Sequence, residues 1–110
     1  MIPEACDVAV PVPLDRVFTY RLPETLRHRV QRGCRVLVPF GTRKLMGVVM
    51  ATHASAHEAT LREVLRLIDE EPVLGESLLK LGEWIAAYYC APLGEVLRGM
   101  TPLAGGKHRT

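Results

Sequence analysis

Prolines divide the first half of the chain into short runs of β-type residues. The runs "DVAVPVP", "VFTYRLP", "CRVLVPF" and "MGVVMATH" are rich in valine and contain aromatic residues, a composition that favours strands. Because proline cannot donate a hydrogen bond to a β-ladder, the prolines in the first three runs predict strand ends, bulges or edges; these are Pro11, Pro13, Pro23 and Pro39. Four short strands of this kind favour a small, strongly bent sheet or barrel over a flat sheet.

The length of the chain allows one domain with a modest core. A domain of 110 residues buries roughly 60–70% of the surface of its unfolded chain. Hydrophobic residues make up 48% and charged residues 24% of the sequence, as in ordinary globular proteins. We therefore expect one domain over residues 1–103, followed by a linker or disordered tail over residues 104–110, "AGGKHRT".

The periodicity becomes helical in the last third of the chain. Apolar residues recur at helical spacing in "SLLKLGEWIAAYY", namely Leu78, Leu81, Ile85 and Tyr88. Ser77 is placed to cap the N-terminus of this helix. Pro92 suits the first turn of a short second helix, which Pro102 would close.

The segment over residues 61–69 fits two patterns. Its apolar residues match the helical template at Leu61, Val64, Leu65 and Ile68. The alternating pattern of a strand also fits, with one face formed by Arg62, Val64, Arg66 and Ile68. The local pattern favours the helix.

Cysteine usage and hydropathy bear on the compartment. Cys6, Cys34 and Cys90 are odd in number and widely spaced, which predicts reduced, mostly buried thiols. No apolar run approaches the ~20 residues of a membrane span, and the start "MIPEACD" lacks the basic and apolar regions of a signal peptide. We expect a cytoplasmic protein without a membrane partner.

Positive charge is concentrated in one part of the chain. Eight Arg or Lys residues and a single Glu lie between Arg16 and Lys44, whereas residues 63–110 contain five basic and seven acidic side chains. This asymmetry favours an anionic partner for the first half. A solvated charged face is the alternative interpretation.

The aromatic residues form two groups. Trp84, Tyr88 and Tyr89 lie on the predicted helix, and we interpret them as helix core. Phe18 and Tyr20 share one face of the second strand beside basic residues. Interleaved aromatic and basic side chains are typical of single-stranded nucleic-acid binding, with core packing as the alternative.

Motifs for catalysis or metal binding are lacking. The sequence contains no GxxxxGK[ST], GxSxG or HExxH motif. His53 and His57 have the spacing of two helical metal ligands, but their alanine-rich polar segment has no nearby Cys or Asp to complete a ligand set. The acidic triplet at residues 69–71 is interpreted as solvated turn residues. We expect neither an enzyme nor a cofactor or metal in this domain.

Three ordered motifs resemble those of a known family. They are V-P-V-P-L-D-x-x-F-x-Y, G-x-R-V-x-V-P-F-G and Y-Y-x-x-P-x-G, joined by the segment "LRLIDEEPVL". Over about residues 7–102 the chain resembles the N-terminal domain of the PriA family of bacterial primosomal helicases. The resemblance implies an α+β, mostly β fold. It consists of a small bent antiparallel barrel-like sheet of about five strands, including residues 61–69, and then one longer and one short helix.

The resemblance also implies a function. The family domain is a non-catalytic 3′-DNA-binding domain, which recognises the 3′-hydroxyl end of the nascent leading strand at stalled forks during replication restart. Its implied partners are forked or single-stranded 3′ ends, other helicase domains and single-strand-binding protein, at the cytoplasmic nucleoid. The alternative is a protein-interaction domain that docks helicase lobes or single-strand-binding protein through the helix carrying Trp84 and Tyr88.

The family's end-binding residues can be placed on this sequence by motif. Phe18 would stack on the terminal base, Gly41 would let the backbone approach the sugar, and Arg62 would neutralise a phosphate. Thr19 stands where a family member has Asp, and its hydroxyl could still hydrogen-bond a 3′-hydroxyl without adding negative charge. The remaining expected DNA contacts are Tyr20, Arg43 and Lys44.

Overall fold

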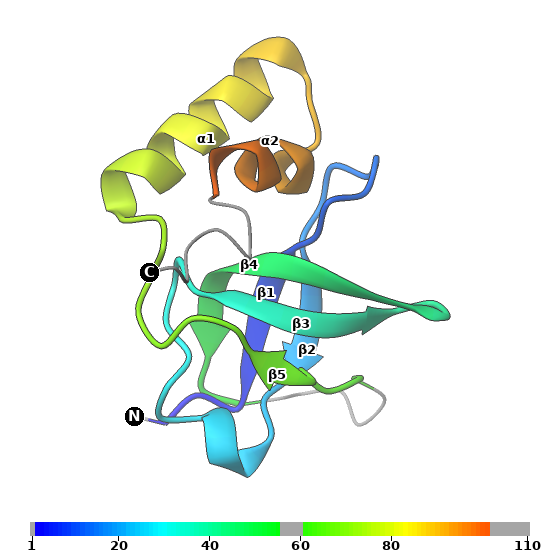
Figure 1. Cartoon of the computed structure of the whole chain (residues 1–110), viewed down its shortest axis with the longest axis vertical. Coiled ribbons are helices and arrows are strands. Elements are labelled where there is room, and N and C mark those ends of the chain that lie inside the picture. Colours follow the sequence, from blue (N-terminus) through cyan, green and yellow to red (C-terminus); the bar gives the residue numbers. More distant parts are fainter. Residues whose placement is uncertain (1, 56–60, 102–110) are drawn as a thin grey trace, which may run out of the picture.

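The structure is a computed structural model that describes residues 2–55 and 61–101 (Figure 1). Its elements follow one another as β1 (Ala5–Ala9), β2 (Phe18–Arg21), the 3₁₀ turn η1 (Glu24–Leu26), β3 (Arg35–Phe40), β4 (Arg43–His53), β5 (Arg66–Leu67), α1 (Glu76–Tyr89) and α2 (Leu93–Met100). The expected tail over residues 104–110 and the expected stop at Pro102 lie outside the described residues.

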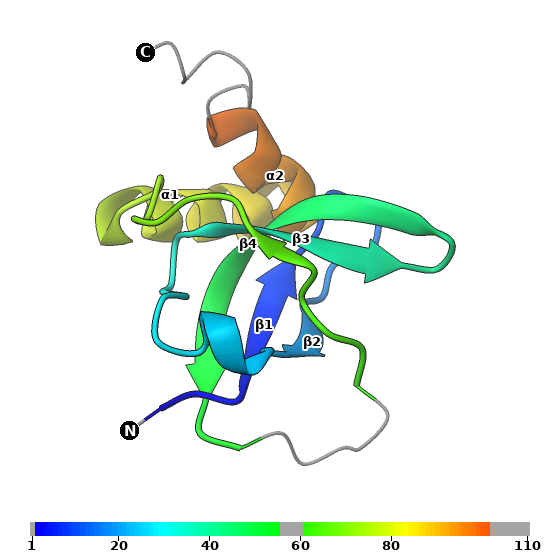
Figure 2. The same ribbon diagram turned by 60° about the horizontal axis from the view of Figure 1, so that its bottom comes forward.

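The strands form one antiparallel sheet with the order β2-β1-β4-β3-β5. The segment that precedes β5 also reaches the opposite edge. The backbone N–H of Arg21 in β2 donates to the carbonyl of Arg62 at 2.9 Å, and the N–H of Val64 donates to the carbonyl of Arg21 at 3.0 Å. These bonds close the bent sheet toward a barrel, and the segment that leads into β5 passes beside β2 in Figure 2. The predicted α+β, mostly β class is confirmed.

Residues 61–69 are extended, so their local helical pattern is misleading. The N–H of Leu65 donates to Leu37 at 2.8 Å, and the N–H of Ile68 donates to Arg35 at 2.9 Å. Only Arg66 and Leu67 are regular strand. Hydrogen bonds to β2 and β3 satisfy this backbone, and they override a helical preference that extends over only two turns.

Two apolar clusters lie on the two faces of the sheet. The barrel core fills the concave side and is built mainly from valines and leucines such as Val8, Val36, Val38, Val49 and Leu22. The helix-side core joins the outer face to the helices and contains Ala9, Val48, Met50, Leu74, Leu79 and Leu97. Figure 1 shows α1 and α2 together at one end of the sheet.

Helix α1 buries a different face from the one expected. Its buried residues are Leu79, Gly82 and Ala86. The predicted core residues are instead exposed, with Trp84 at 58%, Tyr88 at 66% and Tyr89 at 68%, and Leu78 and Leu81 about half exposed. The interpretation of these side chains as helix core is wrong.

The two ends of α1 and the start of α2 differ in detail from expectation. The N-cap of α1 is Gly75, so the prediction that Ser77 caps it is wrong. Cys90 ends α1 in the left-handed conformation and is exposed, whereas Cys6 and Cys34 are buried as predicted. The short second helix begins at Leu93, with Pro92 as its N-cap.

Glycine lets α2 lie directly against the sheet. A Cβ built on Gly94, in the first turn of α2, would lie 1.8 Å from the carbonyl oxygen of Val10. Such a distance is impossible for real atoms, so only glycine allows this approach. The N-terminal turn of α2 is thereby held against the chain that continues from β1.

Three arginines of the basic run between Arg16 and Lys44 pair with carboxylates of the acidic second half. Arg35 and Asp69 form a buried ion pair, with Nε to Oδ2 at 2.8 Å. Arg29 pairs with Glu70, and Arg32 pairs with Glu76 at 2.7 Å. The interpretation of Asp69 as a solvated turn residue is therefore wrong, because its carboxylate holds β3.

Neither helix α1 nor helix α2 could cross a membrane, since no helix in the described part of the chain combines enough length with enough hydrophobicity.

Candidate nucleic-acid interface

The β3–β4 hairpin is the first feature that positions the candidate site. Phe40 pairs with Arg43, which leaves Gly41 and Thr42 as a two-residue turn. Gly41 has φ +62°, the only positive φ in the turn, as in a type II′ turn with glycine at its first central position. A Cβ on Gly41 would meet no atom within 4 Å. The glycine is thus required by backbone conformation, and the space beside it is open.

Aromatic and basic side chains gather beside this turn. The rings of Phe18 and Phe40 meet edge to face with centroids 5.1 Å apart. The guanidinium of Arg16 lies 4.6 Å from the centroid of the Phe18 ring. Nη1 of Arg62 donates to the carbonyl oxygen of Gly41 at 3.0 Å. We call these five residues (Arg16, Phe18, Phe40, Gly41 and Arg62) the Phe18 cluster.

Tyr20 supports this cluster from within the barrel core. Only 5% of its surface is exposed, and its hydroxyl donates to the carbonyl oxygen of Pro39 at 2.7 Å. Burial raises the pKa of the Tyr20 hydroxyl, and the nearby positive charge of Arg62 opposes that rise. The side chain of Tyr20, an expected DNA contact, therefore holds the end of β3 and offers no surface to a ligand.

Thr19 points to the other face of the sheet. Strand alternation places its side chain opposite those of Phe18 and Tyr20, and its hydroxyl donates to Oδ1 of Asp7 at 2.7 Å. Oδ2 of Asp7 lies 2.9 Å from Nε2 of His53. The Thr19 side chain thus lies apart from Phe18, on the outer face, and an acidic group accompanies it there.

The basic side chains at the hairpin tip are solvent exposed. Arg43 and Lys44 follow the turn at the start of β4, and Arg62 lies exposed at its side. None of these three, nor Arg16, forms an ion pair within residues 2–55 and 61–101. With Arg29, Arg32 and Arg35 paired with carboxylates, uncompensated positive charge remains around the Phe18 cluster.

A metal site is not built from the described residues, in which no group of three His, Cys, Asp or Glu side chains comes together. His57, one of the two histidines with ligand spacing, lies outside the described residues.

Two residues beside the site, Phe40 and Asp7, are not among those predicted from the sequence. Phe40 stands immediately before the turn glycine, so an aromatic residue beside a close-approach position is a usable signal. Asp7 has no local signal, because it reaches Thr19 only through the β1–β2 register that pairs the two residues.

The chain matches known proteins along most of its length. Residues 7–102 match the family model of the PriA 3′DNA-binding domain (3′BD). Similar proteins include the replication restart protein PriA of Treponema pallidum, 36% identical over 97 residues, and that of Bacillus subtilis, 36% identical over 93 residues, each covering 83% of this chain. PriA of Haemophilus influenzae is 38% identical over 98 residues, or 87% of this chain.

These relatives are much longer proteins. The matched part is 15% of the T. pallidum protein, 12% of the B. subtilis protein and 13% of the H. influenzae protein.

Proposed function

Because the chain belongs to the family of PriA 3′-DNA-binding domains, we propose that it binds the 3′-hydroxyl end of the nascent leading strand at stalled replication forks. In this proposal the domain is a non-catalytic, cofactor-free part of a longer replication restart protein that acts at the cytoplasmic nucleoid. The longer protein would supply the ATP-dependent helicase activity.

The observation that carries the proposal is the Phe18 cluster. It combines a ring face, an open backbone position and unpaired positive charge at one place. A terminal base would stack on Phe18 and displace the guanidinium of Arg16, which then lies near the strand to neutralise a phosphate. Gly41 would let the hairpin backbone approach the sugar, and Arg62 would bind the adjacent phosphate.

Specificity in this proposal depends on shape and on the free end. Every base has a face that can stack, so base identity should matter little. The Thr19 hydroxyl already donates to Asp7, which leaves its lone pairs to accept a hydrogen bond from a 3′-hydroxyl that reaches the edge of β2. The carboxylate of Asp7 would supply the negative charge that Thr19 lacks and would repel a 3′-phosphate.

The test compares two DNA ends and two matched variants. The domain is titrated with a labelled fork carrying either a 3′-hydroxyl or a 3′-phosphate, and we expect tighter binding to the free end. Arg62→Ala should weaken binding by about tenfold, the scale of one charged hydrogen bond, without unfolding the domain. Arg66→Ala is the control, because Arg66 is exposed on β5 and belongs to no contact of the cluster. Equal affinity for both ends would refute end recognition.

The exposed face of α1 favours a second candidate function. Trp84 and Tyr88 stack with centroids 5.0 Å apart, and both are more than half exposed beside Leu81. An apolar aromatic face of this kind is typical of protein interfaces. In this second function, α1 docks onto helicase lobes or single-strand-binding protein.

The two functions separate in one pair of measurements. Trp84→Ala combined with Tyr88→Ala should abolish binding to isolated helicase lobes or to single-strand-binding protein while leaving DNA binding unchanged. If neither protein binds the wild-type domain, the docking function is refuted.

A further inference from the structure

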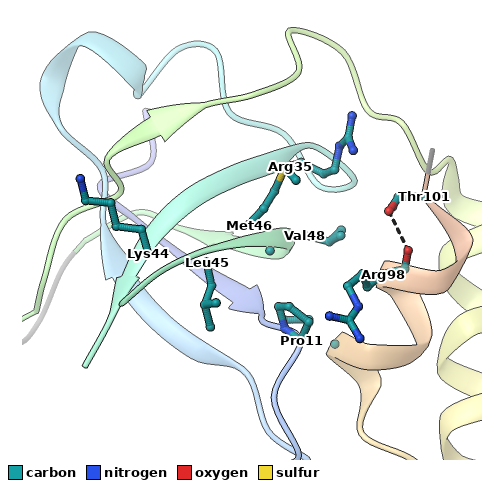
Figure 3. A pocket seen from close by; sticks show the side chains of 11 residues that line it. Pro11, Arg35, Lys44, Leu45, Met46, Val48, Arg98 and Thr101 are labelled. Carbon is teal, nitrogen blue, oxygen red and sulfur yellow. Dashed lines mark hydrogen bonds between the residues drawn. The ribbon is translucent and has the colours of Figure 1, made fainter. Parts of the chain in front are cut away.

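A pocket outside the Phe18 cluster lies between the sheet and α2. Its volume is about 250 Å³, and it is lined by β4, by Pro11 after β1 and by the last turn of α2 (Figure 3). The walls are largely apolar, formed by Pro11, Leu45, Met46 and Val48. The polar lining is basic, with Lys44 and Arg98 as exposed cations and no carboxylate among the lining residues.

Arg98 gives the pocket its charge. In Figure 3 its guanidinium lies beside the ring of Pro11, and Lys44 lies at the opposite end beyond Leu45. Arg35 also borders the pocket, but its charge is compensated by Asp69. Within the described residues the guanidinium of Arg98 forms no ion pair. A basic group over an apolar floor suits a ligand with an anionic part and an apolar part.

The pocket continues from the Phe18 cluster. Leu45 packs on the barrel core together with Phe18 and Phe40, and it also lines the pocket. Lys44 stands three residues after Gly41 and borders the pocket as well. From Lys44 to Val48 the strand covers roughly 13 Å, at about 3.3 Å per residue. A chain molecule held at the Phe18 cluster could therefore extend along β4 to Arg98.

We infer that this pocket binds an internal phosphate and sugar of the same DNA strand, on the 5′ side of the terminal nucleotide. Arg98 and Lys44 contact the phosphates, and the sugar lies on Pro11 and Leu45, whose side chains lie on one side of β4 in Figure 3. This inference rests on the proposed function, which places the 3′ end of the strand at the Phe18 cluster and so sets the direction of the strand. It adds a contact that is independent of the state of the 3′ end, because Arg98 lies on α2, away from the turn.

The experiment uses Arg98→Gln and a matched loss of charge elsewhere, Lys80→Gln on the exposed face of α1. Affinities are measured with a short single-stranded oligonucleotide ending in either a 3′-hydroxyl or a 3′-phosphate. We expect Arg98→Gln to weaken binding about tenfold, by the same factor for both ends. Its salt slope should fall by about 0.7, the value for one phosphate contact on a single strand. Lys80→Gln should change neither.

Further measurements distinguish the loss of a phosphate contact from a general loss of structure. Arg98→Lys keeps the charge and should retain most of the affinity, and thermal unfolding shows that each variant is folded. On addition of the oligonucleotide, the amide resonances of Gly47, Gly94 and Thr101, which line the pocket, should shift in the wild type and shift less in Arg98→Gln.

Wild-type affinity of Arg98→Gln would overturn the inference, as would equal losses in Arg98→Gln and Lys80→Gln. Equal wild-type binding to the two ends would refute end recognition instead, and the ratio of Arg98→Gln to wild type would still report on the pocket.

Discussion

Arg35 and Arg29 both face an acidic residue from the turn after β5, yet the two pairs have different consequences. The Arg35–Asp69 pair is almost fully buried, with 2% and 5% of the residues exposed. Asp69 accepts from both the guanidinium and the backbone N–H of Arg35. The Arg29–Glu70 pair is open to water. Arg29 lowers the pKa of Glu70 through a side-chain hydrogen bond, but solvent screening makes that pair weak.

Asp69→Asn should therefore destabilise the domain strongly. Removing the Asp69 charge takes the carboxylate away from the buried Arg35 guanidinium, and breaking a buried ion pair in this way typically costs about 3–5 kcal/mol. Glu70→Gln is the control and should leave the free energy of unfolding nearly unchanged, because water screens the Arg29–Glu70 pair. Urea unfolding of both variants measures the difference. Similar losses for the two would contradict the assigned difference in burial.

Cys6 makes the stability of the domain sensitive to alkaline pH. Burial raises the pKa of its thiol from 9.0 to about 12, and Asp7 adds to the rise. The unfolded chain loses this proton above about pH 9, whereas the folded chain keeps it until about pH 12. The free energy of unfolding should therefore fall by about 1.4 kcal/mol per pH unit within that window. Cys6→Ala should show a shallower decline in urea unfolding at increasing pH, and an unchanged slope would refute this contribution.

Helix α2 depends on a close approach that most side chains would prevent. Gly94 touches the backbone of Val10, and Leu97 is buried against Gly82 of α1. The same packing explains why α1 turns its small residues inward, since Gly82 and Ala86 let the two helices come together. The larger residues Trp84, Tyr88 and Leu81 are left on the outer face.

Gly94→Ala and Gly99→Ala separate contact from helix propensity. The new Cβ at Gly94 would overlap the Val10 backbone, which cannot move aside, so we expect a loss of about 2 kcal/mol or more. At Gly99 a Cβ would meet nothing within 4 Å, and alanine should raise stability by up to about 1 kcal/mol. Urea unfolding of both variants measures these changes in stability. If Gly94→Ala leaves the stability unchanged, α2 does not contact the Val10 backbone as described.

At the scale of the whole molecule, folding redistributes a charge asymmetry that is plain in the sequence. Arginines of the basic segment pair with carboxylates that follow β5 or lie in α1, among them Asp69, Glu70 and Glu76. Within that basic segment, the exposed cations that form no ion pair with a described residue are Arg16 beside Phe18 and Arg43 and Lys44 at the β3–β4 hairpin.

Salt dependence should report this local charge. Arg43→Gln combined with Lys44→Gln should reduce the slope of log affinity against log salt by about 1.4 for single-stranded DNA, about 0.7 per phosphate contact. The control Arg29→Gln combined with Lys80→Gln removes the same charge elsewhere. If the control lowers the slope equally, binding depends on net charge and not on the hairpin.

Features that depend on neighbouring residues could be predicted from the sequence alone. Prolines and valines indicate four strands and helical spacing indicates α1, because these signals act over one to four residues. Ordered motifs added the family and the fifth strand. The resemblance places Phe18 and Arg62 in one site, and both side chains reach the β3–β4 hairpin. Phe18 contacts the ring of Phe40, and Arg62 donates to the carbonyl oxygen of Gly41.

The tertiary structure alone decided how these elements face and pair. Which side of α1 is buried depends on α2, and the extended form of residues 61–69 depends on β2 and β3. The Thr19–Asp7 contact depends on strand register, and the burial of Arg35 depends on a carboxylate 34 residues away. Each of these outcomes is a competition among long-range partners, and a local pattern contains no information about which partner is present.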